Sequence, residues 1–455
     1  MFIRVHAWAN ILQEMVQKMS DQKIYKPKPV SGFPEWLPEY RAVELQWMDK
    51  IRKVFESYGF CSIETPSVEE IEALLAKGGE TEKEIYTLHR LQADEQGDQD
   101  ARLALHFDLT VPMARYVAQR FNDLVFPFKR YQIQRVWRGE RPQKGRFREF
   151  YQCDIDVINV DSLPLHFDAE LPAVMFEAYQ ALDIPPVEMR LSNRKIIFGY
   201  LQGLGIKDVP VVTRTLDKLD KIGPENVIKI LCAAGLPADI AQKCLALAEI
   251  KTIDNGFVDR VKALGVSHEL LDKGMEELVF VMNNLSHLPN GSLKVDLSII
   301  RGLDYYTGTI LETYLKDVAF GAIGSGGRYD DLAGSFINQK LPGIGVSIGI
   351  TRLFAKLVDE GMVKPGAKSP TQILVVLPEE SRRAEAAATA LTLRRRGYNV
   401  EMFHSDSKVK RQLAYAERKG IPYVWFPSFT EGQPHEVKNM MTGEQIQANA
   451  ASWKI

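Results

Sequence analysis

The alternation of apolar and polar residues between positions 128 and 156 predicts two strands joined by a loop. In the first strand Tyr131 and Ile133 alternate with two glutamines, which is typical of a half-buried strand. The connecting stretch RGERPQKGR contains a proline and two glycines and is therefore a loop. In the second strand one face is apolar and the other is polar. The apolar face comprises Phe147, Tyr151, Cys153, Ile155 and Val157, and the polar face comprises Arg148, Phe150, Gln152, Asp154 and Asp156. We interpret this strand as the floor of a polar pocket.

Apolar residues at helical spacing predict further elements on both sides of this hairpin. They indicate an amphipathic helix over 39–58, closed by Gly59, and a second helix over 163–183. Residues from about 186 to 286 are rich in helical patterns separated by Gly-Pro and Gly-Leu-Pro breaks. After a linker at 365–370, short apolar strands alternate with two helices, which predicts a small parallel α/β domain.

Two glycine-dense stretches carry less information by themselves. Residues 319–332 match neither the dinucleotide-binding nor the P-loop pattern, and a tight turn is the simplest reading. Residues 341–354 predict a strand that leads into a helix, with Arg352 at the start of that helix.

The composition limits the kinds of protein that this chain can be. Its 455 residues suffice for two or three domains. With 59 acidic and 57 basic residues, any nucleic-acid contact must come from local patches rather than from net charge. Four cysteines without CxxC spacing argue against a metal site of the protein's own and favour a reducing, cytoplasmic setting. No apolar run approaches the length of a membrane span, so we expect no membrane contact. We interpret residues 1–20 as a poorly ordered extension.

The predicted hairpin is strongly basic. Between Lys129 and Arg148 there are eight Lys or Arg residues and a single acid, Glu140. Arginine suits phosphate oxygens because its guanidinium is planar, permanently charged and bidentate. A basic hairpin is more often a solvated surface, but Asp154 and Asp156 lie beside the arginines on one face. We therefore favour a site that binds phosphate and a small cationic or polar group side by side.

Two other stretches carry candidate chemistry. Asp108-Leu109-Thr110 reads as a strand end, with a helix beginning near Met113, and is most simply a helix cap. Arg301 follows the apolar strand KVDLSII, and a guanidinium at the end of a buried strand needs an anion. Strict alternation places Tyr305 with Arg301 and Tyr306 opposite, so both tyrosines reach one ligand only if the strand loosens there.

These stretches resemble one known family. RGERPQKGRFREFYQCD resembles the second signature motif of class II aminoacyl-tRNA synthetases, in the version of histidyl-tRNA synthetases, and RGLDYYTGT resembles a motif particular to that family. GFCSIETPSVE, with Pro66, resembles the first class II motif, and LPGIGVSIGITRLF the third. The resemblance implies an α+β fold: a class II catalytic domain over 21–364 on an antiparallel sheet, with a helical insertion at about 187–290. It also implies a C-terminal α/β anticodon-binding domain over 371–455.

The resemblance further implies an activity and a set of site residues. The activity would be ATP- and Mg²⁺-dependent activation of L-histidine to histidyl-adenylate and transfer to the 3′ end of tRNA-His, by a cytoplasmic homodimer. Arg138 and Arg301 would hold the α-phosphate, and Asp156 departs from the longer Glu of some members. The implied catalytic residues are Arg138 and Arg301; the substrate-binding residues are Asp108, Leu109, Thr110, Arg138, Gln152, Asp156, Arg301, Tyr305 and Tyr306; and the ATP-binding residues are Arg138, Glu140, Arg146, Phe150 and Arg352.

Two alternatives share parts of this pattern. A synthetase-like regulatory subunit of histidine biosynthesis should lack the last domain and the arginines, and this chain has both. A non-catalytic tRNA-binding module need not keep Arg138, Arg301 and Arg352.

Overall fold

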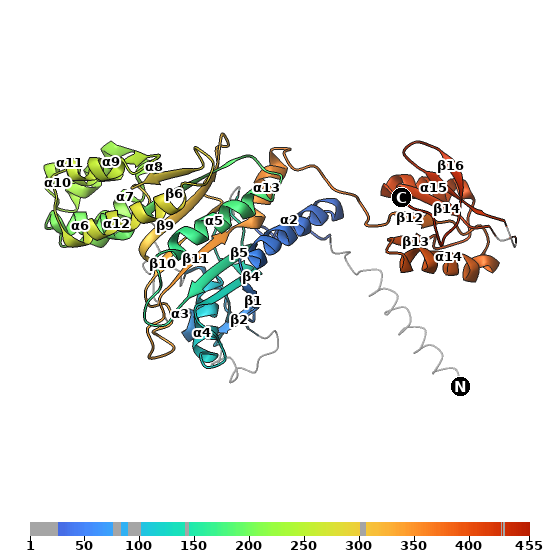
Figure 1. Ribbon diagram of the computed structural model, residues 1–455, viewed down its shortest axis with the longest axis horizontal. Helices are drawn as coiled ribbons and strands as arrows, with labels where there is room; N and C mark the ends of the chain where they lie inside the picture. Colours follow the sequence, from blue (N-terminus) through green and yellow to red (C-terminus); the bar gives the residue numbers. More distant parts are fainter. Residues whose placement is uncertain are drawn as a thin grey trace, which may run out of the picture.

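The larger part of the protein is built on a nine-stranded sheet (Figure 1) with the order β1-β4-β5-β11-β10-β9-β6-β8-β7. The computed structural model describes residues 26–75, 83–89, 102–141, 145–300, 306–428, 430 and 433–455. Neighbouring strands run antiparallel except β1 with β4 and β6 with β8, so the predicted antiparallel sheet is confirmed. The strands are β1 (Cys61–Ser62), β4 (Phe128–Trp137), β5 (Glu149–Ile158), β6 (Val187–Asn193), β7 (Lys251–Thr252), β8 (Leu293–Asp296), β9 (Tyr306–Leu315), β10 (Gly324–Tyr329) and β11 (Gly343–Ile348).

The predicted hairpin is the pair β4 and β5. Gln132 lies opposite Asp154, and Arg130 lies opposite Asp156. Cys153, Ile155 and Val157 are fully buried in the main core, as the alternation predicts. The assignment of Phe147 to that apolar face was wrong, because β5 begins only at Glu149 and Phe147 lines the pocket on the other side.

Three helices cover the apolar face of the sheet. They are α2 (Pro38–Ser57), α5 (Phe167–Gln180) and α13 (Ile350–Asp359), which pack on one another and on β5 and β11 (Figure 1). Trp47 of α2 meets Phe354 of α13 edge-on, with ring centroids 5.2 Å apart. Odd-numbered residues of β5 point into this layer, so even-numbered residues point away from it and are available for a site.

A smaller subassembly carries the Asp108 segment. It contains β2 (Val68–Glu70), paired antiparallel with β3 (Leu103–Leu105), and the helices α3 (Ile71–Leu75) and α4 (Thr110–Gln119). The helix was expected near Met113 after a strand end, but it starts three residues earlier. Pro112 does not prevent this, because the first-turn amides have no intrahelical partner. Asp108 Oδ1 accepts a hydrogen bond from the Val111 amide at 3.1 Å, which fixes its carboxylate at the helix start.

The helical segment begins later than predicted. Its expected start at about 187 is wrong, because Val187, Met189 and Leu191 are buried in the main core from strand β6 of the sheet. Two further strands, β7 and β8, also join the sheet from this part of the chain. The helices are α6 (Arg194–Gly203), α7 (Val209–Leu216), α8 (Leu219–Ile222), α9 (Pro224–Ala233), α10 (Ala238–Ala248), α11 (Phe257–Ala263) and α12 (Glu269–Asn284).

The glycine-rich stretch that suggested a tight turn forms strand β10 instead. Its glycines permit close packing between strands: a Cβ on Gly326 would lie 2.1 Å from the carbonyl oxygen of Gly345. The prediction for residues 341–354 is confirmed, since β11 leads into α13 and Arg352 lies in its first turn.

The C-terminal domain has its own sheet and core. Its sheet order is β13-β12-β14-β15-β16, and the first three strands are parallel, as predicted. The antiparallel strands β15 and β16 were not predicted. Trp425, Phe403 and Leu393 are fully buried in a core that is separate from the main one. The elements are β12 (Ile373–Val375), η3 (Glu380–Arg382), α14 (Arg383–Arg395), β13 (Val400–Met402), α15 (Val409–Lys419), β14 (Tyr423–Phe426), β15 (His435–Asn439) and β16 (Gln445–Ala448).

Two expectations concern the limits of the described chain. The proposed extension over 1–20 lies outside the described residues. Among the helices that the structure does describe, none combines the length and the apolar character that a membrane span requires.

Candidate active site

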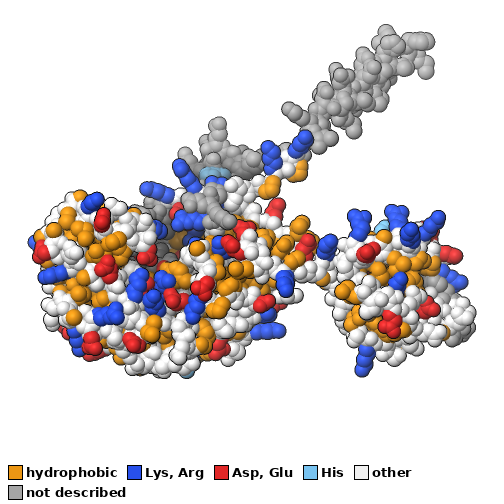
Figure 2. Space-filling view, turned by 90° about the horizontal axis from the view of Figure 1, so that it is seen from above, with side chains coloured by type: hydrophobic (Ala, Val, Ile, Leu, Met, Phe, Trp, Pro, Cys, Tyr) orange, Lys and Arg blue, Asp and Glu red, His pale blue; other side chains and the backbone are white. Residues whose placement is uncertain are grey.

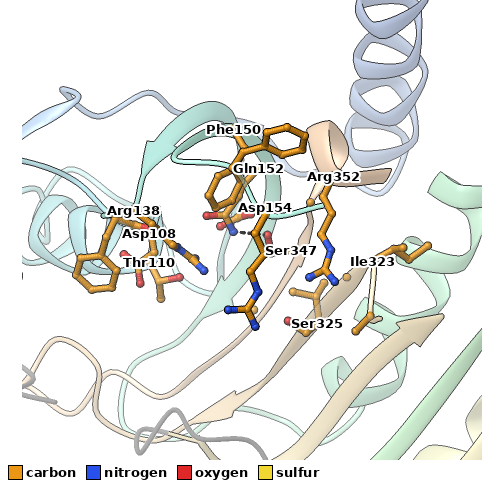
Figure 3. Close-up of a pocket in the computed structure, with 18 of the residues that line it drawn as sticks. Asp108, Thr110, Arg138, Phe150, Gln152, Asp154, Ile323, Ser325, Ser347 and Arg352 are labelled. Atoms are coloured by element: carbon orange, nitrogen blue, oxygen red, sulfur yellow. Dashed lines mark hydrogen bonds between the residues drawn. The ribbon is translucent and has the colours of Figure 1, made fainter. Parts of the chain in front are cut away.

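A pocket of about 410 Å³ lies on the polar face of β5 (Figure 3). Its floor is formed by β5 and by the neighbouring strands β10 and β11. The Asp108 segment borders it on one side, and the start of α13 borders it on the other (Figure 3). The charged and polar lining residues are Glu84, Asp108, Thr110, Arg138, Glu140, Arg146, Gln152, Asp154, Asp156, Tyr306, Ser325, Tyr329, Ser347 and Arg352.

Three carboxylates line this pocket, and the fully buried guanidinium of Arg130 is paired with one of them. Burial raises the pKa of Asp108, the pKa of Asp154 to about 7 and the pKa of Asp156 to about 6. Arg130 opposes the rise at Asp154 and Asp156, and its Nη2 lies 2.5 Å from Asp156 Oδ2. Carboxylates with raised pKa values in a pocket are typical of functional sites.

Asp156 is held by two protein partners. Besides the ion pair with Arg130, its Oδ1 accepts a hydrogen bond from the Tyr329 hydroxyl at 3.0 Å. Gly345 lies opposite Asp156 on β11, and a Cβ at that position would lie 1.9 Å from Asp156 Oδ1. The glycine therefore provides the space that this carboxylate occupies.

Ser347 lies close to both Gln152 and Asp154. Gln152 Nε2 donates to Ser347 Oγ at 2.6 Å. Ser347 lies directly opposite Asp154 on β11, and its hydroxyl lowers the pKa of that carboxyl against the larger effect of burial. Figure 3 shows these three side chains between the Asp108 segment and Arg352.

Arg138 brings a positive charge beside Asp108. Its Nε donates to the carbonyl oxygen of Phe107 at 3.0 Å, and its guanidinium carbon lies 5.1 Å from the centroid of the Phe150 ring. Arg138 is close enough to Asp108 to lower the pKa of that carboxyl, against the larger effect of burial. An anion and a guanidinium thus lie side by side, as the two ends of an amino-acid zwitterion require.

The basic loop adds charges of both signs. Arg146 Nη1 lies 3.1 Å from Glu140 Oε2, and both residues line the pocket. Burial raises the pKa of Glu84, and the nearby charge of Glu140 raises it further. Two carboxylates that repel one another in this way suit a divalent cation held together with phosphate oxygens.

Arg352 lies at the opposite end of the pocket (Figure 3). Its guanidinium carbon is 4.7 Å from the centroid of the Phe320 ring. Phe150 also lines the pocket, so a planar group could lie between an aromatic ring and a guanidinium there.

Most of the predicted site residues line this single pocket. Leu109 does not: its side chain is fully buried, and its carbonyl oxygen accepts from Arg130 Nη2 at 3.4 Å. Arg301 and Tyr305 lie outside the described residues. The predicted residues that line the pocket are Asp108, Thr110, Arg138, Glu140, Arg146, Phe150, Gln152, Asp156, Tyr306 and Arg352.

Some pocket residues were not predicted. Glu84 lies in a short segment in which apolar and polar residues follow neither helical nor strand spacing, so the sequence offers no reason to expect it in the site. Ser347 and Tyr329 come from strands whose glycines conceal the alternation of side chains. The pairing of β5 with β11, which joins residues almost 200 positions apart, is what brings Ser347 to Gln152.

The antiparallel sheet with helices on one face, the arginine-lined pocket on the other and the separate α/β domain form the arrangement that the resemblance to class II aminoacyl-tRNA synthetases implies. A family model described as histidyl-tRNA synthetase matches residues 32–353, and one described as anticodon binding domain matches residues 372–452. The chain belongs to the histidyl-tRNA synthetase family. This family uses ATP.

Similar proteins agree with this family assignment. A histidine–tRNA ligase of Thermobifida fusca is 60% identical over 437 residues, covering 96% of this chain and 100% of that protein. A histidine–tRNA ligase of Micrococcus luteus is 47% identical, and the match covers 93% of this chain and 95% of that protein. The crystal structure of histidyl-tRNA synthetase from Nostoc sp. PCC 7120 matches with a TM-score of 0.83 and 36% sequence identity. The match covers 94% of this chain and 98% of that chain.

Proposed function

We propose that the protein is a histidine–tRNA ligase, which activates L-histidine with ATP and transfers it to the 3′ end of tRNA-His. The observation that carries this proposal is the pairing of Asp108 with Arg138 in one pocket with Arg146 and Arg352. The first pair suits an amino acid, and the other arginines suit a nucleotide phosphate and base.

The amino acid would be held at the deep end. Asp108 and Thr110 supply an anion and a neutral oxygen for the α-ammonium, while Arg138 meets the carboxylate and the α-phosphate. Gln152, Asp156 and Tyr306 also line the pocket and would contact the substrate and its imidazole. Arg301 and Tyr305 are assigned to the α-phosphate and to the substrate by family resemblance alone.

The nucleotide would lie toward the basic loop and α13. Phe150 and Arg352 would enclose the adenine, and Arg146 would meet phosphate oxygens. Glu140 and Glu84 are the carboxylates that would hold Mg²⁺ bound to ATP. When bound, Mg²⁺ neutralises negative charge on the phosphates. The side chains mainly position the reactants and stabilise charge, because the attacking carboxylate belongs to the substrate.

The C-terminal domain would bind the anticodon region of the tRNA. Figure 2 shows Lys and Arg side chains gathered on one side of this domain. Such side chains contact phosphates, and bases of a single-stranded loop are open to specific reading. Exposed candidates on the two helices and beside them are Arg394, Arg395, Lys408, Lys410 and Arg411. We further propose a cytoplasmic homodimer, as the family resemblance implies.

A regulatory subunit of histidine biosynthesis is the alternative. The crystal structure of an ATP phosphoribosyltransferase regulatory subunit/histidyl-tRNA synthetase from Bacillus halodurans C has a TM-score of 0.73 at 20% identity, a likeness that concerns the fold alone. The anticodon-binding domain of this chain and the relatives at 47% and 60% identity favour the ligase.

The test is amino-acid-dependent exchange of pyrophosphate into ATP, run with each of the twenty amino acids. We expect exchange with histidine and background with the others, followed by charging of tRNA-His. Absence of histidine-dependent exchange by the full chain would exclude the ligase and favour the alternative.

A further inference from the structure

Arg148 is a basic residue of the hairpin that is set back from the pocket. Arg146 and Phe147 precede it and Phe150 follows it, and all three line the pocket. Arg148 is half-buried and does not line the pocket that the described residues form. Its role therefore has to be sought in the groups that it holds.

Arg148 joins the two limbs of the basic loop. Its Nε donates to the carbonyl oxygen of Glu140 at 3.1 Å, and its own carbonyl oxygen accepts from the Arg138 amide at 2.9 Å. Glu140 is in turn paired with Arg146, whose Nη1 lies 3.1 Å from Glu140 Oε2. The placement of the Glu140 and Arg146 side chains therefore depends on where Arg148 holds the backbone of Glu140.

A turn that precedes α2 fixes Arg148 from the other side. The carbonyl oxygen of Gly32 accepts from the amides of Arg148 and Glu149, at 2.7 and 3.3 Å. The Phe33 amide closes the turn by donating to the carbonyl oxygen of Val30 at 3.0 Å. Gly32 has a φ of +85°, which suits glycine, and a Cβ there would lie 2.9 Å from Arg148 Cγ. The aliphatic part of Arg148 thus lies directly against the Gly32 backbone, with no room for a side chain between them.

The segment after this turn is anchored to two helices. Trp36 Nε1 donates to Glu44 Oε1 of α2 at 3.2 Å, and Glu44 is buried. The Trp36 ring meets Phe354 of α13 edge-on, with ring centroids 5.2 Å apart. Because α13 also carries Arg352, residues 30–36 connect the basic loop with the helix at the opposite end of the pocket.

We propose that Arg148, braced by residues 30–36, is a positioning residue for ATP. It holds the backbone of Glu140, and thereby the Glu140–Arg146 pair, in the place where these side chains meet Mg²⁺ and the phosphates. This inference rests on the proposed ligase function and goes beyond it, because it assigns a role in nucleotide binding to a segment outside the pocket. Direct contact of the Arg148 guanidinium with a phosphate is the alternative that the test separates.

The test measures nucleotide and histidine separately for the full-length wild type, Gly32→Ala and Arg148→Met. Both variants should lower kcat/KM for ATP in pyrophosphate exchange ~10- to 100-fold, because a displacement of ~1 Å in a positioning group can cost this much. The KM for histidine should stay within about twofold of the wild type. A readout without turnover is the thermal shift caused by each ligand alone. The shift caused by a non-hydrolysable ATP analogue with Mg²⁺ should shrink in both variants, and the shift caused by histidine should not change.

Gly205→Ala is the matched control for backbone strain. Gly205 also has a positive φ, +71°, but a Cβ there would meet nothing within 4 Å. This variant should lose stability in urea unfolding, because alanine is strained at positive φ, and should keep the wild-type KM values.

Arg148→Lys separates positioning from phosphate contact. Lysine keeps the charge but cannot donate from the position of Nε, so its loss should match that of Arg148→Met. Recovery of most of the ATP dependence by Arg148→Lys would assign the side chain to a phosphate and overturn the proposal. Wild-type kcat/KM for ATP in Arg148→Met, or an equal rise of the KM for histidine, would also overturn it. Histidine-dependent exchange by the wild type keeps these results distinct from failure of the proposed function.

Discussion

Asp154 should lower the stability of the protein above neutral pH, so removing its charge should stabilise the fold. Burial raises the pKa of this carboxyl from its usual 3.8 to about 7. One pKa unit corresponds to about 1.4 kcal/mol, so the rise corresponds to roughly 4 kcal/mol of stability lost at pH 8. Asp154→Asn should recover part of this free energy. The figure is an upper limit, because the buried amide of asparagine must also find partners.

The sign of the effect fixes its dependence on pH. A carboxyl whose folded pKa is raised stabilises the fold fully below its unfolded pKa, and this contribution is lost as the pH rises through the folded pKa. The advantage of Asp154→Asn should therefore be greatest at pH 8 and should shrink between pH 7 and pH 4. At pH 5 the expected upper limit is about 2 kcal/mol.

The assay is urea unfolding without histidine at pH 8 and pH 5, followed by a signal from the larger domain. Asp183→Asn serves as the control, because Asp183 is exposed and neutralising it should change stability little at either pH. The reasoning is refuted if Asp154→Asn is no more stable than the wild type at pH 8, or if its advantage is the same at both pH values.

Three further predictions concern the supports of the pocket and the second domain. Arg130→Met should destabilise the protein by about 3 kcal/mol at pH 8, because it leaves the buried Asp156 carboxylate without its ion-pair partner. The loss should be smaller at pH 5, because burial raises the pKa of Asp156 to about 6 and the carboxyl can then take up a proton. Equal losses at both pH values in urea unfolding would contradict this. Gly345→Ala should lower unfolding stability by about 1–3 kcal/mol, since its Cβ would lie 1.9 Å from Asp156 Oδ1, whereas Gly349→Ala meets nothing closer than 3.6 Å and should cost less; equal costs would mean that the strand shifts freely. A chain ending at residue 370 should keep histidine-dependent pyrophosphate exchange and lose most charging of tRNA-His, because the two cores are separate; loss of exchange would mean that the last domain supports the pocket.

The sequence predicts the parts of this fold whose signal is local. The hairpin of β4 and β5 was predictable because its side chains alternate every second residue, and the same alternation marked Gln152, Asp154 and Asp156 as one polar face. The strand β10 was not predictable, because glycines carry no side chain to alternate. The strands β15 and β16 were not predicted for a related reason. HEVKN and QIQA are mostly polar, and they form strands because β15 pairs with β14 and β16 pairs with β15.

The residues that line the site were predictable to a similar extent, but the ion pairs and hydrogen bonds between them were not. Alternation gives no sign that Arg130 is fully buried, and only the register of β4 against β5 sets it opposite Asp156. The interaction of Ser347 with Gln152 depends on a pairing between strands far apart in the chain. The family resemblance placed Asp156 among the substrate-binding residues, and only the structure shows that it is paired with Arg130 and accepts a hydrogen bond from the Tyr329 hydroxyl.

Strand β5 serves stability on one face and recognition on the other, and the two faces have opposite energetic effects. Cys153, Ile155 and Val157 are fully buried in the main core, and such burial is the chief favourable contribution to folding. Between them, Asp154 and Asp156 are buried as carboxylates with raised pKa values, which opposes folding at neutral pH. The fold can tolerate this cost because the strand lies within a nine-stranded sheet whose other face is covered by three helices. A ligand that donates N–H groups to this face would remove part of the cost, so binding and stability are linked: histidine should protect the larger domain from unfolding more strongly than a ring without an N–H.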